Sequence, residues 1–222
     1  MSYELITANR NYSSWSLRPW LLMTELGLPF AERLVPFGQA PFTTFSPTGK
    51  VPCLHDDQAD DPGKATVVWD SLAITEFIAD AFPEHAIWPR DRLARARARS
   101  LCAEMHAGFT RLRTVCPMNI EAFLPEVGQT LWADDEALRA DVTRLDTAWR
   151  EALAASGGPF LFGEFGAVDA FFAPVAVRLS RFSLPLSERA ASYRDALLAH
   201  AAVEDWIADG LREQQFVVED EP

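Results

Sequence analysis

The sequence has few cysteines, and their spacing argues against a small disulfide-stabilised fold. Cys53, Cys102 and Cys116 are the three cysteines among 222 residues, and no two of them form a CxxC pair. An odd, widely spaced set is a poor framework for disulfide bonds. The four histidines are scattered along the chain. We therefore expect reduced thiols and no metal site.

Long apolar runs and an excess of positive charge are also missing. No stretch of about 18 apolar residues is present to span a bilayer, and residues 1–10, MSYELITANR, lack the basic and apolar regions of a secretory signal. With 32 acidic against 20 basic residues the formal net charge is −12, which repels nucleic-acid phosphates. We therefore expect a cytoplasmic protein that binds neither membranes nor nucleic acid.

Residues 1–82 have the pattern of a small α/β unit with a mixed sheet. Apolar residues at helical spacing run from Ser16 to Leu26, and Gly27 is a stop signal. Pro19 is compatible with a helix that starts at about Ser16, because its missing N–H costs no hydrogen bond in the first turn. The other predicted elements are strands at 4–7, 30–36, 51–54 and 66–69 and a helix at 72–80.

The remainder of the chain is predicted to be all-helical. After a short linker, Pro83 to Pro89, clusters of β-branched residues give way to stretches rich in alanine, leucine, arginine and glutamate. These stretches predict helices at 93–115, 134–156, 168–182 and 187–213. The expected organisation is an α/β domain over 1–82, a linker over 83–89 and an all-α domain over 90–222.

The first candidate site is the hydroxyl-rich turn at 11–16, Asn-Tyr-Ser-Ser-Trp-Ser, between the first strand and the first helix. Unpaired N–H groups and the helix dipole favour an anion at a helix N-terminus, and a serine hydroxyl there could donate to a thiolate. The alternative is that one serine is only the N-cap of the helix, a role that suits Ser16.

The second candidate site is the turn at 46–54, Ser-Pro-Thr-Gly-Lys-Val-Pro-Cys-Leu, which leads into a strand. If the Val51–Pro52 peptide is cis, the chain bends so that the backbone N–H and C=O of Val51 turn outward. An extended peptide ligand could then pair with them as an added strand does. The alternative is an ordinary turn with a trans proline.

The third candidate site is the segment Trp69-Asp70-Ser71-Leu72, between an apolar strand and the next helix. Ser71 and the helix N-terminus could bind a carboxylate, and Asp70 could pair with an ammonium group. Either residue could instead be only the N-cap.

In this order and spacing, the three sites resemble the glutathione transferase superfamily. Residues 46–54, S-P-T-G-K-V-P-C-L, are similar to that family's N-P-x-G-x-V-P-x-L motif. Residues 69–78, W-D-S-L-A-I-T-E-F-I, are similar to its E-S-x-A-I-x-x-Y-L motif, with Asp70 in place of glutamate. Residues 158–170 resemble its helical-domain capping segment, in which Gly166 replaces a serine or threonine N-cap three residues before Asp169.

This resemblance implies an N-terminal thioredoxin-like domain with a four-stranded sheet, a C-terminal helical bundle, and a homodimer. It also implies a cis Pro52 and glutathione as co-substrate. The Val51 backbone would bind the cysteinyl unit of glutathione, and Asp70 and Ser71 its γ-glutamyl end. Lys50 would bind a carboxylate, or could instead be a solvated turn residue.

Within the superfamily, residues 13–18, S-S-W-S-L-R, are similar to the S-S-C-x-x-R stretch of the zeta class, the maleylacetoacetate isomerase group. Trp15 replaces the cysteine, and because tryptophan cannot form a mixed disulfide this argues against thiol-transfer chemistry. The resemblance implies that a serine hydroxyl stabilises the glutathione thiolate. Ser14 is the first candidate, Ser13 the second and Ser16 the third. Tyr12 is a further hydroxyl donor or a wall of the pocket.

The second substrate is expected in a cleft between the two domains. The predicted helix at 93–115 places His106 and Arg113 close to one face, where they could contact a substrate anion, although a lone histidine on a helix can be purely structural. The predicted function is a glutathione transferase that attacks a small electrophile. The alternatives are a glutathione-dependent isomerase of the maleylacetoacetate type and a non-catalytic glutathione-binding scaffold.

Overall fold

The structure is a computed structural model, and it describes residues 3–57 and 66–213. The last residues of the expected all-α domain, 214–222, lie outside the described residues. In chain order the elements are β1 (Tyr3–Thr7), α1 (Ser14–Glu25), β2 (Phe30–Leu34), the 3₁₀ helix η1 (Phe42–Thr44), β3 (Cys53–Asp56), β4 (Thr66–Val68), α2 (Ser71–Ala81), α3 (Arg92–Ala107), α4 (Thr110–Val115), α5 (Pro125–Asp134), α6 (Glu136–Ser156), α7 (Ala167–Arg181), α8 (Glu188–Leu198) and α9 (Ala201–Gly210).

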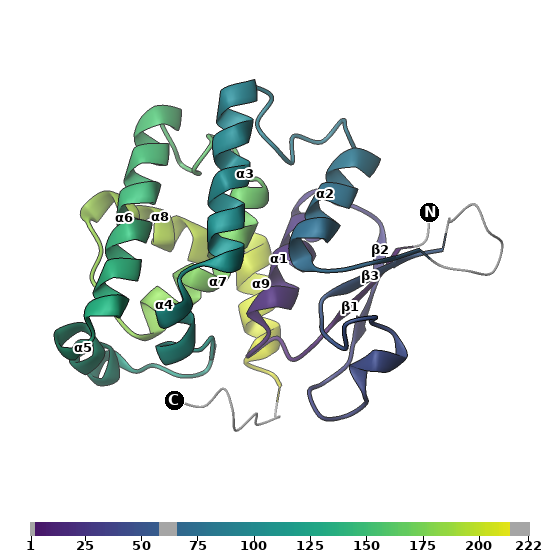
Figure 1. Cartoon of the computed structure of the whole chain (residues 1–222), viewed down its shortest axis with the longest axis horizontal. Coiled ribbons are helices and arrows are strands. Elements are labelled where there is room, and N and C mark those ends of the chain that lie inside the picture. Colours follow the sequence, from purple (N-terminus) through teal and green to yellow (C-terminus); the bar gives the residue numbers. More distant parts are fainter. Residues whose placement is uncertain (1–2, 58–65, 214–222) are drawn as a thin grey trace.

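The predicted fold class is confirmed. A four-stranded mixed sheet of thioredoxin-like arrangement forms one side of the molecule, and the later helices form the other (Figure 1). The strand order is β2-β1-β3-β4, with β1 parallel to β2 and antiparallel to β3, and β3 antiparallel to β4. The parallel pair is connected through α1, as a parallel strand connection requires.

The two faces of the sheet follow from the alternation of side chains along each strand. Leu5 of β1 and its partner Leu54 of β3 are fully buried in the core shared with α1 and α2. Ile6 and its partner Cys53 point to the opposite face, where they pack with Phe45. Helices α1 and α2 therefore cover this face of the sheet, and they in turn contact the helical part of the chain.

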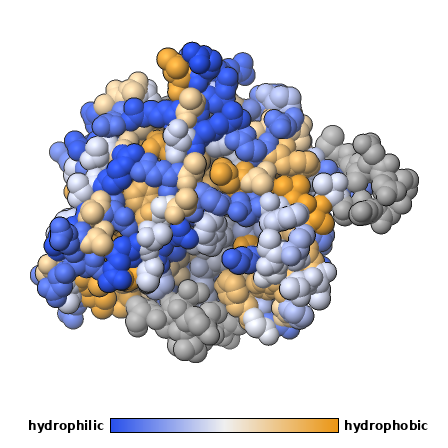
Figure 2. Space-filling model, viewed as in Figure 1, coloured by the Kyte–Doolittle hydropathy of each residue, from blue (hydrophilic) through white to orange (hydrophobic). Residues whose placement is uncertain are grey.

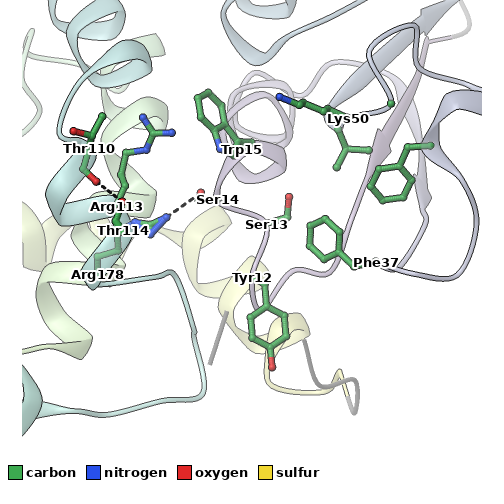
Figure 3. Close-up of a pocket in the computed structure, with 13 residues that line it drawn as sticks. Tyr12, Ser13, Ser14, Trp15, Phe37, Lys50, Thr110, Arg113, Thr114 and Arg178 are labelled. Atoms are coloured by element: carbon green, nitrogen blue, oxygen red, sulfur yellow. Dashed lines mark hydrogen bonds between the residues drawn. The ribbon is translucent and has the colours of Figure 1, made fainter. Parts of the chain in front are cut away.

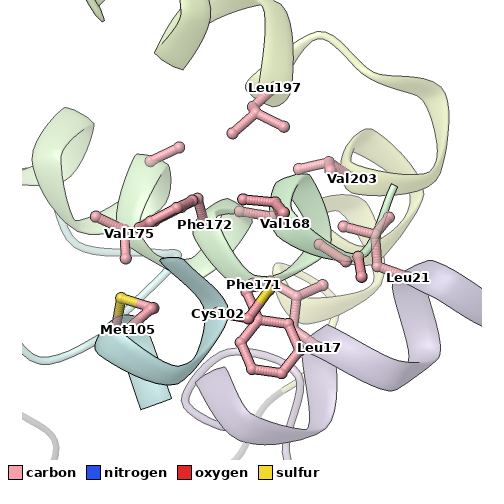
Figure 4. Close-up of a cluster of buried hydrophobic side chains, with 14 of the residues drawn as sticks. Leu17, Leu21, Cys102, Met105, Val168, Phe171, Phe172, Val175, Leu197 and Val203 are labelled. Atoms are coloured by element: carbon pink, nitrogen blue, oxygen red, sulfur yellow. The ribbon is translucent and has the colours of Figure 1, made fainter. Parts of the chain in front are cut away.

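Helix α7 lies at the centre of the molecule and joins the two parts. It packs against α1, α3 and α8, and Figure 4 shows its apolar side chains surrounded by those of the other helices. The drawn residues from neighbouring helices are Leu17 and Leu21 of α1, Cys102 and Met105 of α3, Leu197 of α8 and Val203 of α9. One continuous hydrophobic core therefore holds the first turn of α1 against α7.

The start of α1 differs from the prediction. The helix begins at Ser14, and Ser13 is its N-cap, because the Ser13 side chain accepts a hydrogen bond from the backbone N–H of Ser16. The expected start at Ser16, and Ser16 as the cap, were wrong. Pro19 consequently lies inside the helix rather than in its first turn. A proline there costs a helix hydrogen bond, and the packing of α1 against α7 offsets this cost.

Several predicted helices are shorter than expected. The stretch at 93–115 divides into α3 and α4, because Gly108 ends α3 and Phe109 adopts a left-handed conformation with φ of 51°. The stretch at 187–213 likewise divides into α8 and α9. Helix α5 was not predicted; it begins at Pro125 and contains Gly128, whose missing side chain admits the backbone of Phe182.

The surface seen in Figure 2 is largely hydrophilic, with apolar side chains in scattered patches. The most exposed large apolar residues, Leu93, Phe123 and Leu211, lie in different segments of the chain. Within residues 3–57 and 66–213, no helix combines the length and the apolar character needed to cross a bilayer.

We expect the buried Asp169 carboxylate to stabilise the fold. Gly166 is the N-cap of α7, as the sequence predicts, and the buried Asp169 carboxylate accepts from the N–H of Gly166 over 3.0 Å, from the N–H of Leu161 over 3.2 Å and from Tyr193 Oη over 2.7 Å. Asp169→Ala leaves these donors without an acceptor, so the free energy of unfolding at pH 7 should fall by about 3 kcal/mol. Urea denaturation measures the loss. Asp205→Ala, on the exposed side of α9, is the control, and equal stability of both variants would contradict the prediction.

Candidate functional site

A cavity of about 610 Å³ opens where the sheet part and the helical part meet. Its walls come from the β1–α1 loop and α1, from segments 37–42 and 49–51, and from α4 and α7. The lining residues are Tyr12, Ser13, Ser14, Trp15, Phe37, Phe42, Gly49, Lys50, Val51, Thr110, Arg113, Thr114 and Arg178. Figure 3 shows the serines between Arg113 and Arg178 on one side and Lys50 and Phe37 on the other.

The three serines of the first turn have different hydrogen-bond partners. Ser13 Oγ donates to Ser16 Oγ over 2.8 Å, and Ser16 Oγ accepts from the backbone N–H of Ala8 over 3.2 Å. Ser16 is fully buried and does not line the cavity. Ser13 and Ser16 therefore hold the start of α1 against the end of β1.

Ser14 is bonded instead to the helical part of the chain. Its Oγ accepts from Nη2 of Arg178 over 3.1 Å, and Nη1 of Arg178 donates to the C=O of Cys116 over 3.2 Å. Both Ser14 and Arg178 line the cavity. In the described part of the chain the Ser14 hydroxyl hydrogen has no assigned acceptor, so among the three serines it is the one best able to donate to a ligand.

Two guanidinium groups pack against the ring of Trp15. Arg18 is 4.1 Å and Arg113 4.9 Å from the centre of its ring. Burial, and then repulsion from Arg113 and Arg178, lowers the pKa of Arg18 to about 9, which leaves it charged at neutral pH. Arg178 at Ser14, and Arg18 and Arg113 at Trp15, thus place three cations near the start of α1 in a chain whose net charge is −12.

His106 does not line the cavity, although Arg113 does. Burial is the main cause that lowers the pKa of His106, with Asp70 opposing it, so the ring is neutral at neutral pH. Its Nε2 lies 3.2 Å from Asp70 Oδ2, a distance at which a neutral ring donates a hydrogen bond. The ring also packs edge-on against Trp15. His106 therefore links α3 to the start of α2 behind the cavity wall.

The Val51–Pro52 peptide is cis, as the resemblance implies. Lys50 and Val51 line the cavity, and Pro52 is buried beneath them. Lys50 is solvent-exposed. The structure thus brings these two residues to the same cavity as Ser13 and Ser14.

Asp70 and Ser71 lie at the start of α2 and are not among the residues that line the cavity. Asp70 is the N-cap, accepting from the N–H of Leu72 over 3.1 Å, so the capping alternative holds for it. Ser71 is fully buried, and its Oγ has no hydrogen-bond partner among the described residues. A buried hydroxyl without a partner is costly in a folded protein.

Tyr12 lines the cavity, but Figure 3 shows its ring turned away from the serines. Asn11, the residue before Tyr12, anchors the loop between β1 and α1. Asn11 Oδ1 accepts from the N–H of Ile120 over 2.6 Å, and its own N–H donates to Glu213 over 3.1 Å. The loop that precedes Ser13 is thus held by two segments from the helical part.

Sequence reasoning missed Arg178, Thr110, Thr114 and the wall residues Phe37 and Phe42. A signal for Arg178 existed: it is a cation in the otherwise apolar run Phe171–Leu179 of a predicted helix. A charged residue in such a run is rarely buried unless it has a partner. Thr110 and Thr114 lie on the predicted helix at 93–115 near Arg113, but an uncharged hydroxyl on such a helix carries no comparable signal.

The cysteines of the chain are free and buried. Burial raises the pKa of Cys53 to about 11, that of Cys116 to about 12, and that of Cys102 well above its ordinary value. These thiols are protonated at neutral pH and are therefore poor nucleophiles. Among the described residues, no group of three or more His, Cys, Asp or Glu side chains is arranged to hold a metal ion.

Residues 12–81 match the family model for the glutathione S-transferase N-terminal domain. They contain the serines, the cis proline and the start of α2. These residues belong to the glutathione S-transferase N-terminal domain family, and the chain is similar to a glutathione transferase along most of its length. Over 187 residues the chain is 27% identical to glutathione S-transferase GstB of Escherichia coli. The aligned residues cover 81% of this chain and 85% of the relative.

Solved structures of glutathione transferases share the fold of this chain. A glutathione transferase homologue from a Burkholderia strain, BGR1, with bound glutathione has a TM-score of 0.71 and 21% identity, over 96% of this chain and 100% of the other. A maleylacetoacetate isomerase from Anaeromyxobacter dehalogenans, with dicarboxyethyl glutathione and citrate in its active site, has a TM-score of 0.67 and 22% identity, over 98% of this chain and 94% of the other.

Because of its buried hydrogen bonds, we expect Ser16 to contribute to stability, whereas Ser14 lines the cavity. In Ser16→Ala, the N–H of Ala8 and the hydroxyl of Ser13 lose a buried partner, so the free energy of unfolding should fall by about 1–3 kcal/mol. Thermal unfolding followed by circular dichroism measures this change. Ser192→Ala, an exposed serine on α8, is the control. A Ser16→Ala protein as stable as that control would show that the hydroxyl is not structural.

Proposed function

We propose that this chain is a glutathione transferase that binds glutathione beside Ser14 and stabilises its thiolate for attack on a small electrophile. The observation that carries the proposal is the position of Ser14, which is the first residue of α1, lines the cavity and has its hydroxyl hydrogen unassigned. The match of residues 12–81 to the glutathione S-transferase N-terminal domain, and a structural neighbour with bound glutathione, support it.

The chemical task is to lower the pKa of the thiol. A free thiol has a pKa of about 8.5 and is only a few per cent thiolate at pH 7. The S–H proton passes to water, and the electron pair left on sulfur is stabilised by the Ser14 hydroxyl and by the positive end of α1. A shift of two units corresponds to about 2.7 kcal/mol. The thiolate then forms a bond to the electrophile as its leaving group departs.

The remainder of glutathione is proposed to extend from Ser14 over the cis-proline turn. The backbone of Val51 would pair with the cysteinyl unit, and Lys50 would bind a carboxylate. Asp70 and Ser71, at the N-terminus of α2, would bind the γ-glutamyl end. Residues 1–82 would act as the glutathione domain and 90–222 as the second-substrate domain, joined by 83–89, in a cytoplasmic homodimer.

The charge of the cavity favours an electrophile that carries a carboxylate. Arg113 and Arg178 lie on the side of Ser14 away from Lys50 (Figure 3), together with the hydroxyl-bearing Thr110 and Thr114. None of the described lining residues is acidic. Arg113 is the proposed contact for a substrate anion, and His106 is placed behind the wall.

The same charge pattern favours a second candidate function, isomerisation of an unsaturated dicarboxylic acid. The Anaeromyxobacter maleylacetoacetate isomerase, which shares the fold, holds dicarboxyethyl glutathione and citrate in its active site. An isomerase returns glutathione unchanged, whereas a transferase consumes it. Measuring free thiol while an unsaturated dicarboxylic acid reacts therefore distinguishes the two functions.

Ser14→Ala should lower kcat about a hundredfold with a generic aryl halide electrophile, the loss expected for a donor to a developing anion. Glutathione affinity should stay within about tenfold, because the serine bond matters most to the thiolate. Steady-state kinetics and calorimetric titration measure the two quantities, with Ser13→Ala as the companion variant. Unchanged turnover in Ser14→Ala would move the role to Ser13 or to the helix end. No turnover in the wild type, with glutathione still bound, would favour a scaffold.

Arg113→Met should raise KM for a carboxylated electrophile by about tenfold or more, since a charge-assisted hydrogen bond contributes about 1.5–3 kcal/mol. KM for the methyl ester of the same compound should hardly change. This ester comparison controls for the structural bonds that Arg113 makes to the C=O groups of His106 and Gly108. Equal effects on acid and ester would contradict an anion contact at Arg113.

A further inference from the structure

Arg178 reaches the site from α7, outside the segment that matches the glutathione S-transferase N-terminal domain. It is 7% exposed and Ser14 is 6% exposed, so the bond between them lies in a largely dry environment. Figure 3 shows this bond as the dashed line from Arg178 to Ser14. Burying a cation is unfavourable unless it is well bonded, and Arg178 uses two of its nitrogens on the Cys116 C=O and on Ser14.

The chemistry of this pair sets the direction of its hydrogen bond. A guanidinium group has N–H donors and no acceptor, so Ser14 Oγ is the acceptor. The single hydrogen of the Ser14 hydroxyl must therefore point to another group. Donation by a cation also polarises the hydroxyl and strengthens the bond that the hydroxyl donates in turn.

We propose that Arg178 is a positioning residue for thiol activation, which holds the Ser14 hydroxyl with its hydrogen directed at the glutathione sulfur. The inference rests on the proposed function of Ser14. Arg178 gives up no proton: the thiol proton still leaves to water, and the sulfur electron pair accepts the hydrogen bond from Ser14. The helical part of the chain thereby sets the reactivity of a ligand that the sheet part binds.

Arg18 and Arg113 add positive charge near the same point, so the test must separate orientation from charge. The measurement is ultraviolet titration of the thiolate band of bound glutathione in the wild type, Ser14→Ala, Arg178→Met and the double variant. Each single substitution should raise the thiol pKa by about one unit. If Arg178 acts through Ser14, the double variant should show no larger shift than Ser14→Ala alone.

Arg181→Met, one turn further along α7 and outside the cavity, is the matched control and should leave the thiol pKa unchanged. Circular dichroism checks folding, and Arg178→Leu, which also lacks a donor, takes the place of Arg178→Met, with the same criterion, if the latter does not fold. Shifts that add in the double variant, or no shift in Arg178→Met, would overturn the inference while a depressed wild-type pKa keeps the proposed function. A wild-type pKa equal to that of free glutathione would overturn both.

Discussion

The packing of α7 against α1 is the contact on which the rest of the structure depends. Leu17 and Leu21 of α1 and Phe171 of α7 are fully buried in the core that joins the sheet part to the helical part. Interiors of this density do not deform continuously, so the two helices have one well-defined relative position. That position brings Arg178 within hydrogen-bond distance of Ser14 and forms one wall of the cavity. The capping bonds of Asp169 at the start of α7 hold the same helix in place.

The charge of the cavity contrasts with that of the chain. The protein has a net charge of −12, yet Lys50, Arg113 and Arg178 line the cavity and Arg18 lies behind Trp15. In a partly desolvated site these cations interact strongly with a bound anion. A thiolate at Ser14 and carboxylates on either side of it are the anionic groups that this arrangement suits.

The fold could be predicted from the sequence largely because its signals are local. The motif around Pro52 and the motif at Asp70–Ser71 have fixed spacing. Apolar residues repeat about every 2 residues in strands and about every 3.6 residues in helices, so their spacing marks both kinds of element. The errors arose where tertiary contacts decide the outcome. The Ser13 cap moved the start of α1, and Phe109 divided a helix that composition alone predicts as continuous. The backbone of Phe182 lies against α5 only because Gly128 has no side chain. Arg178 could not be placed beside Ser14, because 164 residues separate them in the chain.

The most direct test of the proposed roles of Ser14 and Arg178 is a crystal structure of the protein with glutathione. We expect the glutathione sulfur to lie within hydrogen-bond distance of Ser14 Oγ, Arg178 still to donate to Ser14, and the peptide backbone to run along Val51. A sulfur placed at Ser13 or Tyr12, or glutathione bound outside the cavity, would contradict these roles.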